Sequence, residues 1–157
     1  MGQYYILVNL TTGEYVHPHD VGDGAKLMEI AYSTHGLMTA LTVLLASGNG
    51  RGNGDVNTDH PLVGRWAGHR VVLAGDYDDH GLFCADFAAA VAARTGAPAV
   101  AANFDPDGER LYQLASNIGR NLAPELYDCF ASAREAFGQQ SFITQGDSGG
   151  ELAPAQS

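Results

Sequence analysis

The sequence is poor in basic residues. Its 157 residues include 8 Lys and Arg against 18 Asp and Glu, which gives a formal net charge of −10. The basic residues, Lys26 and several arginines, are spread along the chain and form no stripe. Nucleic acids and anionic lipid surfaces bind clustered Lys and Arg, so neither is expected as a partner.

Long apolar runs and a cysteine framework are also missing. No stretch approaches the roughly 18 apolar residues of a membrane-spanning helix, and residues 1–30 lack the basic and apolar regions of a secretory signal. The two cysteines, Cys84 and Cys129, fall in helix-like segments, where buried, reduced thiols are expected. These absences predict a cytoplasmic protein that does not act at a membrane.

Length and composition favour a single compact domain. A chain of this length with 45% hydrophobic residues can bury a core that is stable without disulfide or metal cross-links. From Gly138 onward the chain is rich in Gln, Ser and Gly and has little to bury. We therefore predict one globular domain over residues 1–137 and a flexible tail over 138–157.

The first part of the chain predicts a β-hairpin followed by two helical pieces. An apolar run over 4–10, a Thr-Thr-Gly turn and a second extended segment ending at Pro18 are typical of a hairpin. Asp23 is the expected N-cap of the helical segment that follows. Gly36 is expected to break that segment in two.

The middle of the chain predicts a βαβ unit. Continuous apolar runs over 70–76 and 98–103 flank a helical pattern that stops at Gly96. Strands joined in this way run parallel, with a right-handed crossover. With further helical patterns after residue 109, the expected fold is α/β: an N-terminal hairpin joined to a small mixed sheet, with helices packed on it.

Carboxylates follow both predicted strands, at Asp76, Asp78, Asp79, Asp105 and Asp107. The carboxyl ends of parallel strands lie at the same edge of a sheet, so these side chains are expected to lie close together at that edge. Asp76, Asp78 and Asp105 there would suit Mg²⁺ or Ca²⁺, and a bound metal could position a phosphate. The alternative is that the aspartates form turns and helix caps.

Histidines are a second candidate. His17 and His19 flank a proline and stand beside Asp20, so a zinc ligand or general-base role is conceivable. No HExxH motif or cysteine pair completes a site of this kind. Capping or surface histidines are the alternative.

The third candidate is the glycine-rich stretch "LLASGNGRGNGD". Its successive N–H groups could form an anion nest with Arg51 as the charged partner and Asp55 nearby. It is not a Walker loop, because it lacks Gly-Lys-Ser/Thr and follows a helix. A flexible connection, with Gly48 ending the helix, is the alternative.

Trp66 and Arg65 follow this loop. The indole could stack on a flat ligand while Arg51 or Arg65 meets its phosphate, which would make the glycine loop a lid. Alternatively, Trp66 covers an edge of the core.

Four stretches resemble a known family. "MGQYYILVNL", "HPHDVGDGAKLMEIA", "LLASGNGRGNGD" and "GRWAGHRVVLAGDYDD" are similar to a widespread family of short, uncharacterised bacterial and phage proteins. The resemblance covers residues 1–80 and implies no activity. It points to polar and aromatic positions within those stretches: His17, His19, Asp23, Arg51, Asp55, Arg65, Trp66, Asp76 and Tyr77.

Three hypotheses of function follow. The first is a binding protein for a small anion or nucleotide that uses the glycine loop, Arg51, Arg65 and Trp66. The second is a phosphohydrolase dependent on a divalent metal held by the aspartates at the strand ends. The third is an acidic interaction or inhibitor protein of phage or host origin. The sequence leaves open whether the protein is an enzyme.

Overall fold

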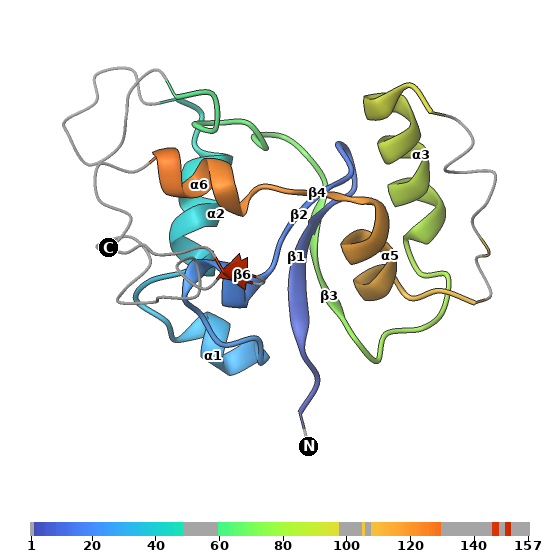
Figure 1. Ribbon diagram of the computed structural model, residues 1–157, viewed down its shortest axis with the longest axis horizontal. Coiled ribbons are helices and arrows are strands. Elements are labelled where there is room, and N and C mark those ends of the chain that lie inside the picture. Colours follow the sequence, from blue (N-terminus) through green and yellow to red (C-terminus); the bar gives the residue numbers. More distant parts are fainter. Residues whose placement is uncertain are drawn as a thin grey trace. The chain divides into compact units, whose positions relative to one another are not determined.

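The computed structural model describes residues 2–48, 60–97, 105, 108–129, 146–147 and 150–151. It contains a four-stranded mixed sheet together with helices, so the predicted α/β class is confirmed (Figure 1). The chain falls into two compact units. Unit 1 comprises Met1–Val16 and Gly68–Leu122, and unit 2 comprises His17–Ala67 and Ala123–Ser157. One domain over 1–137 with a tail beyond it stays a prediction.

Unit 1 is built on the mixed sheet. Its strands are β1 (Tyr5–Asn9), β2 (Glu14–Val16), β3 (Val71–Gly75) and β4 (Arg120–Asn121), in the order β3-β1-β2-β4. β1 runs antiparallel to β2 and β3, while β2 and β4 are parallel. The predicted hairpin is therefore confirmed. The short strand β4 was not predicted, because its two polar residues continue a helical pattern.

The predicted βαβ unit is described in part. Its first strand is β3, and its helix is α3 (Cys84–Thr95), which ends as predicted at Gly96 with φ 71°. Among the described residues β3 pairs with β1, and that pairing is antiparallel. Residues 98–103 lie outside the described residues, so the parallel crossover stays a prediction.

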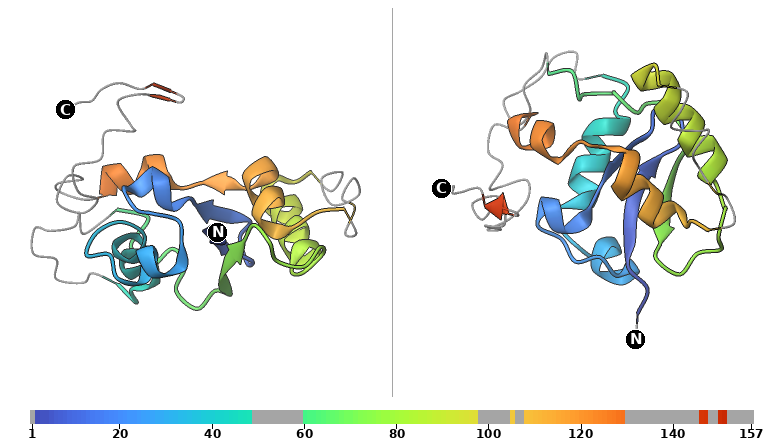
Figure 2. Two further views of the ribbon diagram at one scale, coloured as in Figure 1. Left: turned by 90° about the horizontal axis from the view of Figure 1, so that it is seen from below. Right: turned by 45° about the vertical axis from the view of Figure 1, so that its right-hand side comes forward.

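Helices α3 and α5 (Leu111–Ile118) lie beside the sheet of unit 1 (Figures 1 and 2). They share one core with apolar side chains of the strands. The buried members of this core are Ile6, Val8, Leu10, Ala74, Cys84, Phe87, Val91, Leu111, Leu114 and Ala115. Ile6 and Val8 are two residues apart on β1 and therefore point to the same face. Cys84 is a free, buried thiol, as predicted.

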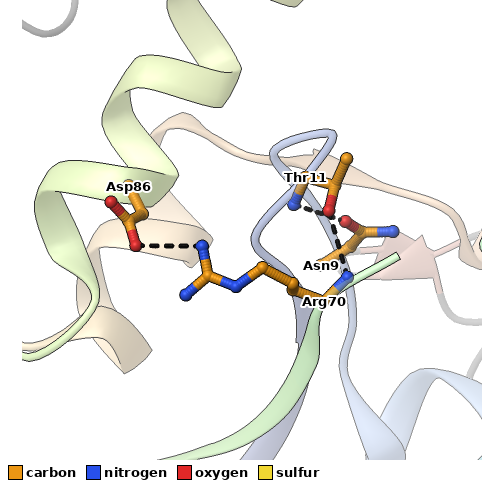
Figure 3. Close-up of polar contacts among 4 residues, drawn as sticks. All are labelled: Asn9, Thr11, Arg70 and Asp86. Carbon is orange, nitrogen blue, oxygen red and sulfur yellow. Dashed lines mark hydrogen bonds and ion pairs between the residues drawn. The ribbon is translucent and has the colours of Figure 1, made fainter. Parts of the chain in front are cut away.

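The hairpin turn is held by a buried asparagine (Figure 3). Asn9 is fully buried, and its Oδ1 accepts the backbone N–H groups of Thr11 at 2.7 Å and Thr12 at 3.0 Å. The Thr11 hydroxyl in turn accepts the N–H of Arg70, whose guanidinium pairs with Asp86 at 3.2 Å. The side chain of Asn9 thus supplies acceptors that the turn's own backbone lacks.

Unit 2 contains the other helices. They are the 3₁₀ helix η1 (Pro18–Val21), α1 (Leu27–Ala31), α2 (Leu37–Leu45) and α6 (Ala123–Cys129). Two short strands of unit 2, β5 (Gly146–Asp147) and β6 (Gly150–Glu151), pair antiparallel. The break at Gly36 is confirmed, since α2 begins immediately after it. No helix in the described stretches is long and apolar enough to cross a bilayer.

Asp23 caps a different helix from the one predicted. The N-cap of α1 is Lys26, whereas Asp23 Oδ2 accepts the N–H of Leu37, the first residue of α2, at 3.1 Å. Its Oδ1 accepts the N–H of Gly24 at 3.0 Å. Gly36 permits this approach: its φ is +96°, and a Cβ there would lie 2.8 Å from Asp23. The sequence signal for a cap was correct, but its partner lies 14 residues further along the chain.

The Asp23 carboxyl is nearly buried, and burial raises its pKa above the usual value, although hydrogen bonds from Leu37 and Gly24 oppose the shift. A raised carboxyl pKa in the folded state means that ionising Asp23 costs more there than in the unfolded chain. The stability contributed by Asp23 is therefore full below its unfolded pKa and is lost as pH rises through its folded pKa.

The Asp23→Asn variant tests this assignment. Asparagine cannot ionise, and its amide N–H₂ faces a backbone donor, so at low pH the wild type should be the more stable protein. Urea unfolding from about pH 3 to pH 7 should show this advantage shrinking as pH rises. An advantage that grows with pH would show instead that the pKa of Asp23 is lowered on folding.

Candidate functional site

The residues after β3 lie against the N-terminal segment in unit 1. Tyr4 and Asp76 are joined twice: the N–H of Asp76 donates to the carbonyl of Tyr4, and the N–H of Tyr4 donates to Asp76 Oδ1, both at 2.9 Å. This contact extends the β1–β3 pairing, whose last pair is Tyr5 and Gly75. The acidic residues predicted at the strand end therefore share this edge with an N-terminal tyrosine.

Asp78 forms the turn at this edge. Its Oδ1 accepts from Gln3 Nε2 at 2.9 Å, and its Oδ2 accepts from the N–H of Gly75 at 2.8 Å. The carbonyl of Asp78 accepts from Arg110 Nε at 2.8 Å. Both carboxylate oxygens are therefore engaged by N–H donors, as expected for the turn-forming alternative.

The metal site proposed at Asp76, Asp78 and Asp105 stays a prediction. Asp105 is exposed, and its carbonyl accepts the N–H of Gly108 at 3.1 Å. Within the described part of the chain, no three His, Cys, Asp or Glu side chains are grouped so as to hold a metal ion. A cation at Asp78 would compete with the N–H donors of Gln3 and Gly75 for the carboxylate oxygens.

Large apolar side chains are exposed at this edge and along the loop that leads from it to α3. Tyr4 is 44% exposed, Tyr77 63%, Leu82 45% and Phe83 38%. They come from the segment before β1 and from the loop between β3 and α3, which the Tyr4–Asp76 hydrogen bonds join. We call the set Tyr4, Asp76, Tyr77, Asp79, Leu82 and Phe83 the rim.

Phe83 has an unusual backbone. Among the described residues it is the one non-glycine residue with positive φ, at 62°, and it is the N-cap of α3. For a bulky L-residue this conformation costs about 1–2 kcal/mol. Its carbonyl accepts the N–H of Phe87 at 3.1 Å and so starts the helix. Phe83 therefore combines a strained backbone with partial exposure of the residue.

A tyrosine of α5 completes the surroundings of the rim. Partial burial, then the nearby charges of Asp76 and Tyr4, raise the pKa of the Tyr112 hydroxyl. It is therefore protonated, and able to donate a hydrogen bond, at neutral pH. Gln3, Tyr4, Arg110 and Tyr112 were not predicted from the sequence. Finding them required the antiparallel pairing of β1 with β3, for which the sequence offers no short motif.

The residues proposed for ligand binding are only partly described. Arg51 and Asp55 lie outside the described residues. Trp66 is fully buried, and its backbone N–H donates to the carbonyl of Leu44 at 2.8 Å. The indole therefore presents no surface on which a ligand could stack in this structure, and the core alternative describes it correctly. Arg65 is half-buried in the adjoining turn.

His17 acts as a cap rather than as an open metal ligand. Its Nδ1 accepts the N–H of His19 at 3.1 Å, which places the proton of the neutral ring on Nε2. The two rings lie 4.9 Å apart between centroids. Burial lowers the pKa of His17, although Asp20 opposes the shift. Metal binding through Nε2 would require the capping hydrogen bond to break.

Unit 2 also contains a histidine–aspartate pair that was not predicted from the sequence. His60 Nε2 lies 3.0 Å from Asp128 Oδ2, and His60 Nδ1 accepts the N–H of Leu62 at 3.2 Å. The neutral ring therefore donates from Nε2 and accepts at Nδ1. Because both nitrogens are engaged, His60 has no free lone pair with which to act as a general base.

A scan against protein-family models found no matching family, and searches of curated proteins and of solved structures found no match to this chain. The resemblance of residues 1–80 to bacterial and phage proteins therefore stays a prediction.

Asp78 and Asp79 provide a matched pair of variants. Asp78→Asn places an amide N–H₂ against one of two N–H donors, so it should lower the free energy of unfolding by about 1–3 kcal/mol. Asp79→Asn removes the same charge from an exposed neighbour and should change stability by less than about 0.5 kcal/mol. Urea denaturation of both variants measures the difference. Equal effects would contradict the turn-forming role of Asp78.

Proposed function

We propose that this protein acts by binding another protein through the rim of unit 1. The observation that carries this proposal is the exposure of four large apolar side chains, Tyr4, Tyr77, Leu82 and Phe83, on two segments that the Tyr4–Asp76 hydrogen bonds join. Aromatic residues supply much of the binding energy at protein interfaces, and exposed apolar patches rimmed by polar groups are typical of them.

The strain at Phe83 supports the same proposal. Glycine would adopt its φ of 62° without cost, whereas phenylalanine is strained there. Residues held in sparsely populated backbone regions concentrate at functional sites. A partly exposed aromatic ring on a strained, helix-anchored backbone is well placed to serve as a rigid anchor for a partner.

This choice follows the third sequence hypothesis, an acidic interaction protein. A cytoplasmic setting, and the absence of nucleic-acid and membrane partners, remain part of the proposal. The phosphohydrolase hypothesis has less support, because the N–H groups of Gln3 and Gly75 compete with a metal ion for the oxygens of Asp78.

Selection of peptides from a random library displayed on phage tests the proposal. Peptides selected on the whole chain should lose binding to Tyr77→Ala and Phe83→Gly but retain it with Tyr32→Ala. Tyr32, in unit 2, is 81% exposed and serves as the aromatic control.

Phe83→Gly should remain folded, because relief of about 1–2 kcal/mol of backbone strain offsets the lost ring burial. Its melting temperature verifies this before binding is compared. Selected peptides that bind both rim variants as tightly as the wild type would contradict the proposal.

The glycine loop is a second candidate, as a site for a small anion or nucleotide. The supporting observation is that the segment after the loop is hydrogen-bonded to the end of α2. The backbone N–H of Gly64 donates to the carbonyl of Val43 at 3.0 Å, and that of Trp66 donates to the carbonyl of Leu44 at 2.8 Å. Compact loops whose ends are held close together are frequently functional. In this proposal Arg51 supplies the positive charge.

Thermal unfolding with a panel of nucleotides and inorganic phosphate tests the loop. A ligand that binds only the folded state should raise the melting temperature, and Arg51→Gln should abolish the rise. The control is Arg70→Gln, because Arg70 forms an exposed ion pair, whereas Arg94 supports the hairpin turn. Arg70→Gln should leave the rise in melting temperature unchanged. No rise with any anion would exclude this candidate.

A further inference from the structure

The charges of unit 1 are divided between the two ends of its sheet. Three of its arginines lie at the hairpin-turn end. Arg94 donates to the carbonyls of Thr12 and Gly13 at 2.9 and 3.2 Å. Arg120 stands opposite Glu14 in the sheet register, and Arg70 precedes β3 at that same end.

The rim end carries the opposite charge. Asp76, Asp78 and Asp79 follow β3 there, and the chain around Glu109 joins them through the hydrogen bond from Gly81 N–H to the carbonyl of Glu109 at 2.8 Å. The basic side chain at this end is Arg110, which donates to the carbonyl of Asp78. At the hairpin-turn end Glu14 and Asp86 offset two of the three arginines, so the acidic rim end carries the larger net charge of the two ends.

Two rim carboxylates have acceptor capacity beyond their bonds within the protein. In the described part of the chain, the hydrogen bond that Asp76 accepts on its carboxylate comes from Tyr4 N–H to Oδ1. Asp79 is exposed, and it is the backbone carbonyl of Asp79 that accepts from Leu82. Tyr4 is joined to Asp76 by two backbone hydrogen bonds, and the exposed Tyr77 lies between Asp76 and Asp79 in the chain. Carboxylates next to aromatic faces suit a guanidinium, which can form paired hydrogen bonds and stack at once.

We propose that the partner of the rim is a protein segment in which arginines alternate with apolar residues, the arginines meeting Asp76 and Asp79 and the apolar residues covering Tyr77 and Phe83. This inference rests on the proposed docking function and adds the chemistry of the partner. Charge complementarity selects such a segment, because the acidic rim repels acidic surfaces and nucleic acid.

The test uses a short synthetic peptide of alternating Arg and Leu, labelled for fluorescence anisotropy. A second peptide carries citrulline, which keeps the shape of arginine without its charge. The arginine peptide should bind the whole chain, and binding should weaken as ionic strength rises. The citrulline peptide should bind at least roughly tenfold more weakly.

Charge-matched variants locate the site. The double variant Asp76→Asn and Asp79→Asn should weaken binding of the arginine peptide by roughly tenfold or more. The control, Asp86→Asn with Asp128→Asn, removes two exposed charges outside the rim and should leave binding within about twofold. Equal loss in both double variants would reduce the effect to net charge and overturn the inference.

This outcome is separate from failure of the docking proposal. If library peptides bind the rim but lack basic residues, or if citrulline serves as well as arginine, the rim remains a docking surface and the inferred partner chemistry is wrong. If Tyr77→Ala and Phe83→Gly leave peptide binding unchanged, the docking proposal itself fails.

Discussion

The pairing of β1 with β3 determines the arrangement of unit 1. It runs from Tyr5 opposite Gly75 to Asn9 opposite Val71. At one end it brings Tyr4 beside Asp76, and at the other it brings Arg70 beside the hairpin turn. A shift of the register by one residue would turn the buried face of each strand to the opposite side. The Tyr4–Asp76 contact at the rim and the contact of Arg70 with Thr11 at the hairpin turn therefore depend on a single ladder of backbone hydrogen bonds.

The same pairing separates structural from available carboxylates. Each oxygen of Asp78 accepts a hydrogen bond, one from Gln3 and one from the N–H of Gly75, and Asp78 forms the turn that presents its neighbours. Asp76 and Asp79, on either side of it, keep oxygens that can meet a partner. Adjacent residues of one type thus have different roles, set by which backbone donors each can reach.

Local patterns predicted the elements well. The hairpin, the strand at 71–75, the glycine break at Gly36 and the helix stop at Gly96 all follow from apolar periodicity and from glycine's freedom at positive φ. These features depend on residues close together in the chain, so a sequence window contains their cause.

Features that depend on distant partners could not be predicted in this way. Asp23 caps α2 rather than the nearer helix, because the chain folds back at Gly36. For Trp66 the sequence left a core position and a ligand-stacking ring as alternatives, and the fold shows that the residue is fully buried. Tyr4 and Gln3 joined the candidate site only through the β1–β3 pairing, and Asp128 met His60 across 68 residues of sequence.

Amide hydrogen exchange at Tyr4 and Asp76 tests the central pairing most directly. Each N–H is hydrogen-bonded to the other residue, so both should exchange slowly, as the amides that pair β1 with β3 should. Free exchange at both positions, with the inner strand amides protected, would show that the ladder stops short of the rim and would contradict this account.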